Sequence, residues 1–258
     1  MKNIALITGA SSGIGLELAK VHAKRGGDLI LVARRKELLE DLKKELESKY
    51  GVTVLVISKD LAKVNAAKEL YQEVKKQNLI VDYLINNAGF GGRGKFHERS
   101  WENDKDMINL NVLALVELTR LFLDDMVALN KGAILNVASM AGFVPGPLQA
   151  IYYATKAFVV SFTEAIANEL SNTKVTATVL CPGPTDTEFF DVANMTGVRG
   201  LKRGRASAKD VAQLGYDQMK QGKTIAIPGL MNKGLLFATR ILPRSLATKI
   251  SRYMMEKA

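Results

Sequence analysis

Short apolar runs and amphipathic segments alternate along nearly the whole chain of 258 residues. The apolar runs are continuous, as is typical of strands buried on both faces of a parallel sheet. The segments between them carry apolar residues at helical spacing with charged residues on the other side. We therefore expect an α/β protein with a Rossmann-like, doubly wound parallel sheet of about seven strands, flanked by helices on both faces. Strands are expected at 4–7, 29–33, 52–57, 82–86, 132–138, 174–180 and 224–227, and helices at 14–25, 36–49, 65–77, 101–129, 150–170 and 208–221.

No repeat, low-complexity stretch or linker divides this alternation, so we expect a single domain over residues 1–258. Two segments stand apart from it. The loop after the sixth strand, which begins at Pro182, is expected to form a substrate lid at about 184–206. The extension at about 230–258 is apolar and basic. We expect it to pack on the body, to join a subunit interface or to lie on a membrane surface, in that order of preference.

The charge and composition argue against a nucleic-acid partner and against a membrane-spanning helix. The net charge is +10, but the basic residues are dispersed and form no stripe with aromatic residues. We therefore expect no nucleic-acid partner and assign the charge to solubility and to attraction of a phosphorylated cofactor. No apolar run reaches the roughly 18 residues of a membrane-spanning helix. The short apolar run after Lys2 indicates a first strand instead of a signal peptide.

The few cysteine and histidine residues bear on compartment and metal binding. Cys181 is the only cysteine, which excludes an intramolecular disulfide and fits a reducing, cytoplasmic environment. His22 and His97 form no recognisable ligand set with it, so no metal site is expected.

A glycine-rich turn over residues 8–15, with the sequence TGASSGIG, joins the first strand to the first helix. Glycines let the backbone turn tightly and let a pyrophosphate approach closely. The helix N-terminus offers free N–H groups and a partial positive charge to that anion. The alternative is a glycine-rich turn without a ligand, because the spacing differs from Gly-x-Gly-x-x-Gly. Its position between strand and helix favours nucleotide binding.

The second strand ends in Ala33-Arg34-Arg35, and no acidic residue follows it. An acidic residue there would bind the free ribose 2′-hydroxyl of NAD(H). Guanidinium groups instead suit a 2′-phosphate, so the sequence favours NADP(H), with Arg34 preferred over Arg35. The alternative is that both arginines merely begin the next solvated helix.

Tyr152 and Lys156 lie four residues apart in a segment with helical spacing, and Ser139 lies upstream. Residues four apart share a helix face, so the ammonium is expected one turn from the phenol. A nearby positive charge lowers a phenol pKa that is otherwise about 10, which makes tyrosine usable for proton transfer. The alternative is a surface tyrosine beside a surface lysine, and Tyr153 is a rival for the catalytic position.

These motifs, together with Asn86-Asn87-Ala88-Gly89, Asn111 and the segment 182–187, resemble the short-chain dehydrogenase/reductase family from residue 3 to about 230. The resemblance implies hydride transfer between NADP(H) and a carbonyl or alcohol. Ser139 would hydrogen-bond the substrate oxygen and Tyr152 would protonate it. Lys156 would keep the phenol acidic and bind the nicotinamide ribose, and Asn111 would anchor a relay water.

The same resemblance implies the cofactor contacts. The glycine-rich turn would wrap the pyrophosphate, Asp60 would bind the adenine amine, and Thr185 and Thr187 would bind the carboxamide. The residues expected at the cofactor are Gly9, Ser11, Ser12, Gly13, Ile14, Gly15, Arg34, Arg35, Asp60, Leu61, Asn87, Ala88, Gly89, Tyr152, Lys156, Pro182, Gly183, Thr185 and Thr187.

We expect a carbonyl reductase acting on a hydrophobic ketone, aldehyde or 3-oxoacyl group. The alternatives are an NAD-linked alcohol or steroid dehydrogenase and a catalytically silent nucleotide-binding regulator. The resemblance also implies a homodimer or homotetramer through the helices at 101–129 and 150–170. The candidate pocket walls, which could equally be core or lid packing, are Phe90, Phe143, Val144, Pro145, Leu148, Phe189 and Phe190.

Overall fold

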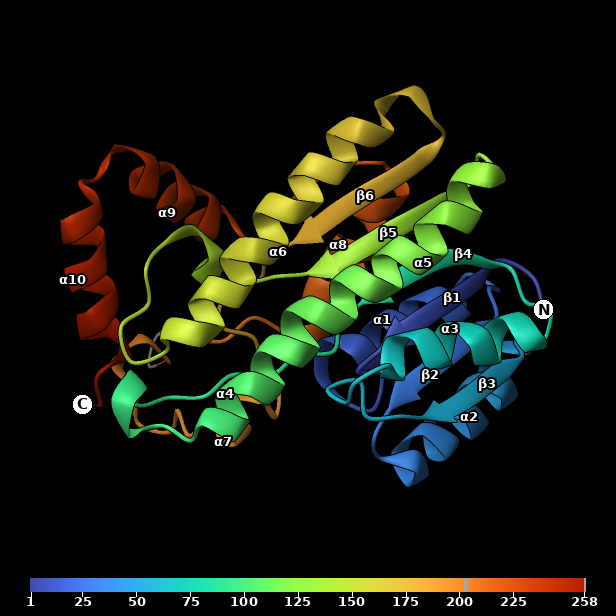
Figure 1. Ribbon diagram of the computed structural model, residues 1–258, viewed down its shortest axis with the longest axis horizontal. Coiled ribbons are helices and arrows are strands. Elements are labelled where there is room, and N and C mark those ends of the chain that lie inside the picture. The colour runs from blue at the N-terminus through green and yellow to red at the C-terminus, as the bar shows by residue number, and fades with distance from the viewer. Residues whose placement is uncertain (202–203, 258) are drawn as a thin grey trace.

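The computed structural model describes residues 1–201 and 204–257. It contains a parallel sheet of seven strands in the order β3-β2-β1-β4-β5-β6-β7 (Figure 1), which confirms the predicted fold class. The strand order reverses between β1 and β4, and ligands of such sheets bind outside the carboxyl ends of the strands at this point. The strands are β1 (Ile4–Thr8), β2 (Leu29–Ala33), β3 (Val54–Ser58), β4 (Val81–Asn86), β5 (Gly132–Val137), β6 (Val175–Leu180) and β7 (Ile225–Ala226).

Helices cover both faces of the sheet. Apolar residues of α1, α2 and α8 form one core layer with the strands, and those of α3, α5 and α6 form the other. Each layer buries the apolar side of amphipathic helices against strands whose residues are mostly buried. The helices are α1 (Gly13–Lys24), α2 (Lys36–Tyr50), α3 (Ala66–Lys76), α4 (Trp101–Ile108), α5 (Leu115–Ala128), α6 (Ala150–Glu169), α7 (Phe189–Val192), α8 (Ala208–Lys220), α9 (Leu230–Ile241) and α10 (Arg244–Met255).

The helix expected at 101–129 is continuous but not uniform. A π-helical segment, Asn109–Ala114, separates α4 from α5. A π-helical turn inserts an extra residue into the helix and redirects the side chains around it. Here the buried Asn111 reaches the backbone of Phe90 through hydrogen bonds, which offsets the irregular turn.

The C-terminal extension forms the two helices α9 and α10, which lie at one edge of the molecule beyond α6 (Figure 1). Ala247 and Ser251 of α10 are buried, and Arg93 Nε donates to the Met255 carbonyl at 2.9 Å. Among the helices that the structure describes, none combines the length and the apolar character needed to span a bilayer. Residues 202–203 of the expected lid and Ala258 at the end of the extension lie outside the described residues.

Candidate active site

The glycine-rich turn packs directly against the chain that follows β4. Gly9 has a φ of +67°, and a Cβ there would lie 2.9 Å from the Ala88 Cα. A Cβ on Gly15 would lie 2.3 Å from the Gly9 carbonyl oxygen. Asn87 Nδ2 donates to the carbonyl oxygens of Thr8 and Gly9 at 2.9 and 3.2 Å. Only glycine therefore fits these positions, and the turn at the start of α1 packs closely on the chain that follows β4.

The four expected catalytic residues come from three parts of the fold and converge beside this turn. Ser139 follows β5, Tyr152 and Lys156 lie on the first turns of α6, and Asn111 lies in the π-helical segment. The Ser139 hydroxyl lies close enough to the Tyr152 phenol to influence the pKa of the phenol. The Lys156 ammonium lies 5.9 Å from the centre of the Tyr152 ring and donates to the Val137 carbonyl at 2.8 Å.

Asn111 ties these elements together. Its side chain accepts from the Phe90 N–H at 3.1 Å and donates to the Phe90 carbonyl at 3.0 Å. It also donates to Thr155 Oγ1 at 3.2 Å, and Thr155 in turn donates to the Tyr152 carbonyl at 2.7 Å. A Cβ on Gly89 would lie 2.9 Å from Asn111 Oδ1 and 3.4 Å from Lys156 Nζ. The expected role of Asn111 in holding a relay water stays a prediction.

Burial dominates the electrostatics of the Tyr152–Lys156 pair. Desolvation raises the pKa of the Tyr152 phenol above its usual range, and the nearby Ser139 hydroxyl offsets only part of this. Desolvation also lowers the pKa of Lys156 to about 8. The sequence-based expectation of a lowered Tyr152 pKa was therefore wrong for this structure. The phenol is buried, and the ammonium hydrogen-bonds the Val137 carbonyl instead of the phenol oxygen.

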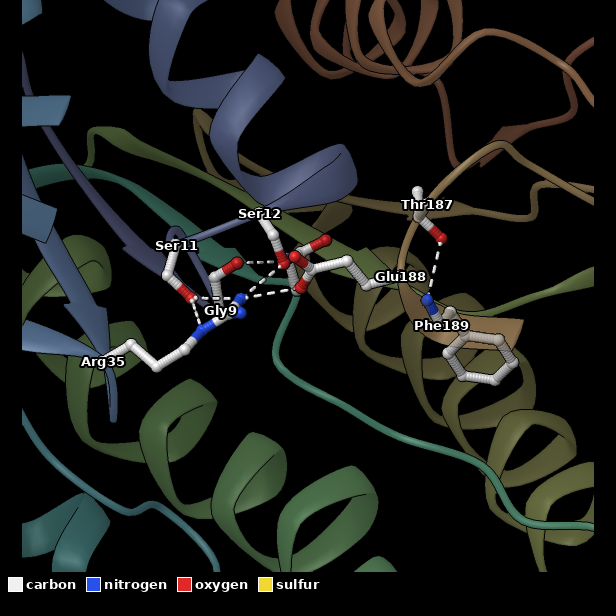
Figure 2. Close-up of polar contacts among 8 residues, drawn as sticks. Gly9, Ser11, Ser12, Arg35, Thr187, Glu188 and Phe189 are labelled. Atoms are coloured by element: carbon white, nitrogen blue, oxygen red, sulfur yellow. Dashed lines mark hydrogen bonds and ion pairs between the residues drawn. The ribbon is translucent and has the colours of Figure 1, made fainter. Parts of the chain in front are cut away.

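Arg35, not Arg34, carries its guanidinium to the glycine-rich turn (Figure 2). Arg35 Nη2 donates to Ser11 Oγ at 3.1 Å and to Ser12 Oγ at 2.9 Å. The Arg34 side chain is exposed, and among the described residues it makes no hydrogen bond or ion pair. Arg35 therefore contacts the glycine-rich turn directly, and the ranking of Arg34 over Arg35 for the 2′-phosphate stays a prediction.

The first part of the lid, residues 187–189, lies beside the glycine-rich turn (Figure 2). A Cβ on Gly13 would lie 2.9 Å from Thr187 Cγ2. The Glu188 carboxylate pairs with Arg35 at 2.9 Å, and this hydrogen bond is the main influence that lowers the pKa of the Glu188 carboxyl. The ring of Phe189 lies 5.3 Å from the ring of Tyr152. Residues 187–189 therefore lie against both the phosphate-binding turn and the candidate acid.

The remaining expected cofactor residues surround the carboxyl ends of the strands. Asp60 accepts from the Ala62 N–H at 3.1 Å after β3, with the buried Leu61 beside it. After β6, Pro182 accepts from the Met140 N–H at 2.9 Å, and a Cβ on Gly183 would lie 2.8 Å from Asn232 Nδ2. Thr185 donates to the Gly183 carbonyl, and Ile14 packs on the core below the turn.

The sequence analysis missed several groups at the site. Glu188 follows Thr187 directly, but nothing in its spacing indicated a partner on the other side of the site. Thr155 lies three residues after Tyr152, a spacing that places both on one helix face and that could have indicated its contact. The Val137 carbonyl, which accepts from Lys156, carries no sequence signal.

The fold and these motifs can be set beside known proteins. The family model for short chain dehydrogenases matches residues 3–196. The chain belongs to the short-chain dehydrogenase/reductase family. It is therefore an oxidoreductase of the class that acts on CH–OH and C=O groups with a nicotinamide cofactor.

Two proteins with similar sequences are oxidoreductases by name. The chain is 39% identical over 192 residues to the NADP-dependent 3-hydroxy acid dehydrogenase of Schizosaccharomyces pombe, covering 71% of this chain and 72% of that protein. It is 35% identical over 201 residues to very-long-chain 3-oxoacyl-CoA reductase-A of Danio rerio. That match covers 76% of this chain but only 60% of the reductase, so the activity of the whole reductase does not transfer directly.

Two solved structures show the same architecture with different cofactors. A short-chain dehydrogenase from Sphingobium yanoikuyae in complex with NADPH has a TM-score of 0.83 at 30% identity, covering 92% of this chain and 93% of that chain. A short-chain dehydrogenase/reductase from Burkholderia phymatum in complex with NAD has a TM-score of 0.83 at 26% identity, covering 99% and 97%. The family therefore establishes a nicotinamide cofactor, and the choice between NADP and NAD depends on the residues of this chain.

Proposed function

We propose that this protein is an NADPH-dependent reductase of a hydrophobic ketone, aldehyde or 3-oxoacyl group, with Tyr152 as the acid. The observation that carries the proposal is the Ser139 hydroxyl next to the buried Tyr152 phenol, with the Lys156 ammonium over the Tyr152 ring. Two hydroxyl groups converge there on the place that a substrate oxygen would occupy. The glycine-rich turn, the start of α1 and the donors Ser11, Ser12 and Arg35 fit an anionic dinucleotide.

The residues of this chain would transfer the proton to the substrate oxygen. The bound nicotinamide supplies the hydride. Ser139 orients the carbonyl oxygen of the substrate, and Tyr152 donates its proton to that oxygen. Burial keeps the phenol protonated near neutral pH because it raises the pKa of Tyr152, so the acid is ready for reduction. Lys156, which is charged below its pKa of about 8, stabilises the phenolate that forms.

Arg35 is the proposed determinant of cofactor choice. Its guanidinium lies at the end of β2, where NAD-binding folds place an acidic residue, and it already donates to two serines of the turn. Replacing Arg35 by Ala is expected to weaken NADPH binding by about tenfold to a hundredfold, because a hydrogen bond to a charged group is lost. NADH binding should change little, and titration of both cofactors by fluorescence measures the difference.

Arg34→Ala is the matched control for that experiment, since Arg34 is the adjacent exposed arginine and is expected to leave NADPH binding within about threefold. Equal losses of NADPH and NADH affinity in Arg35→Ala would contradict the assignment. A larger loss of NADPH binding in Arg34→Ala would transfer the 2′-phosphate contact to that residue.

Glu188 is expected to compete with the cofactor phosphates for Arg35. Its carboxylate pairs with Arg35 and also hydrogen-bonds Ser12, so the lid must release both before a phosphate can bind there. Glu188→Gln should therefore tighten NADPH binding by about twofold to fivefold, the size expected for a partly exposed ion pair. The control is Asp186→Asn, which removes a lid carboxylate paired with Arg205 instead. Weaker NADPH binding in Glu188→Gln would refute this competition.

The helices α4, α5 and α6 leave apolar side chains exposed that a homo-oligomer would cover. Trp101 of α4, Leu113 of the π-helical segment and Phe158 of α6 are each exposed. They lie on the two segments expected to form subunit contacts, so a homodimer or homotetramer remains part of the proposal.

A further inference from the structure

The helix α9 presents a broad apolar face that nothing in the described chain covers. Leu230 is 84% exposed, and Phe237 and Ile241 are 66% and 69% exposed. These three residues are seven and eleven positions apart, so they lie on one side of the helix. Met231 and Leu235 are exposed as well, on an adjoining side of the helix. The opposite side packs on the body through Leu236, which contacts the cluster beneath β6 and β7.

The helix α10 also has one side packed on the body and an exposed apolar side. Ala247 and Ser251 face the body and are buried. Leu246, Ile250 and Tyr253 lie at four- and seven-residue intervals on another face and are exposed. We call the exposed apolar residues of both helices the α9–α10 face. The two helices lie at one edge of the molecule (Figure 1).

The charged residues around the α9–α10 face are mostly basic. Residues 229–258 contain one acidic residue, Glu256, and it already pairs with Arg199 and Arg252 at 3.4 and 3.0 Å. The basic residues of the same segment are Lys233, Arg240, Arg244, Lys249, Arg252 and Lys257. An apolar face bordered by basic residues requires an occupant that is both apolar and anionic.

We propose that the α9–α10 face binds the surface of a bilayer that contains anionic phospholipid. Each helix has only 12 residues, so both would lie in the plane of the interface without crossing the membrane. A second copy of the chain is a poorer occupant. Two identical faces brought together around a twofold axis would place their basic residues against one another.

The helices α9 and α10 also contact the candidate active site, so membrane binding would place the site near the bilayer. Asn232 of α9 packs on Gly183, which follows β6 at the cofactor side of the site. Met255 at the end of α10 packs on the lid cluster that contains Phe189 and Phe190. A bilayer held by α9 and α10 would therefore lie next to the lid, where an apolar carbonyl compound could pass from lipid to protein. The binding itself does not depend on the reductase activity.

Co-sedimentation of the full-length protein with vesicles tests the proposal. Binding is expected to vesicles of phosphatidylcholine mixed with phosphatidylglycerol, to weaken as salt screens the attraction, and to be much weaker to phosphatidylcholine alone. Arg244→Gln and Lys249→Gln should each weaken binding by about fivefold, the share of one basic side chain near an anionic surface. Phe237→Ser combined with Ile250→Ser should weaken it further by removing the apolar contact.

The control is Val64→Ser combined with Lys68→Gln. These substitutions change an exposed apolar residue and an exposed basic residue that are far from α9 and α10 in the sequence. This control should bind vesicles like the unchanged protein. The proposal is overturned if the unchanged protein does not bind anionic vesicles, or if the control loses as much binding as the α9–α10 variants. It is also overturned if Phe237→Ser with Ile250→Ser alters the oligomeric state in sedimentation velocity without affecting vesicle binding.

Discussion

Replacing Tyr152 by Phe is expected to lower carbonyl reduction by about 10²–10⁴-fold, the contribution typical of a positioned acid. The variant keeps the aromatic ring, which packs against Phe189 and lies below the Lys156 ammonium. It loses only the hydroxyl that lies close to Ser139. The loss should therefore appear in kcat, with a much smaller change in the KM for NADPH. Steady-state rates of NADPH oxidation measure both.

Tyr153→Phe is the matched control for this experiment. Tyr153 is the neighbouring phenol, and its hydroxyl lies near Ser251 of α10 instead of Ser139. Removing that hydroxyl should leave kcat within a few-fold of the unchanged protein, since it lies outside the Ser139–Tyr152 pair. If Tyr153→Phe lost more activity than Tyr152→Phe, the acid would be Tyr153 and the assignment made from spacing would be wrong.

Replacing Lys156 by Met is expected to have the second-largest effect, again about 10²-fold or more on kcat, because the charge that stabilises the phenolate is removed. The pH dependence should change with it. In the unchanged protein the pKa of Lys156 is about 8, so the ammonium is lost as pH rises through this value. The reduction rate should fall above about pH 8, and this decline should be absent from the weaker activity of Lys156→Met.

The free energy of unfolding should rise with pH above about 8 because of Lys156, whereas the reduction rate should fall there. Its folded pKa of about 8 lies below the ordinary value of 10.5, so between these values the unfolded chain binds more protons than the folded one. Stability linked to this group therefore rises with pH from about 8 toward 10, above which the raised pKa of Tyr152 acts against it. Urea unfolding across this window should show the rise in the unchanged protein and in Lys68→Met, but not in Lys156→Met. A rise retained in Lys156→Met would refute this explanation.

Much of this architecture follows from local patterns. The run 29–33 is continuous and apolar because β2 is buried on both faces, and the glycine-rich turn stands between β1 and α1 where the motif predicts it. The ends of strands were less predictable. The third strand was expected at 52–57 and occupies Val54–Ser58, and the last one contains only Ile225 and Ala226. Such boundaries depend on pairing with neighbours that are distant in sequence.

The features that the sequence did not reveal depend on contacts between distant segments. Periodicity cannot distinguish a π-helical turn from an α-helical one, and the segment at 109–114 is held by the bonds of Asn111 to Phe90. Arg34 and Arg35 are adjacent, and the sequence alone does not show that Arg35 is the one that contacts the glycine-rich turn. The pKa of Tyr152 is raised because the phenol is buried. One of the residues that contact it is Phe189 of the lid, which is far away in the sequence.

The central claim is that this member of the family turns over a carbonyl substrate with NADPH. Oxidation of NADPH, followed across a panel of ketones, aldehydes and 3-oxoacyl thioesters with product analysis, tests it most directly. We predict that at least one hydrophobic member of the panel is reduced to its alcohol in equal amount to the NADPH consumed, and faster than with NADH. Tight NADPH binding without turnover of any member would contradict the account and would indicate a nucleotide-binding regulator.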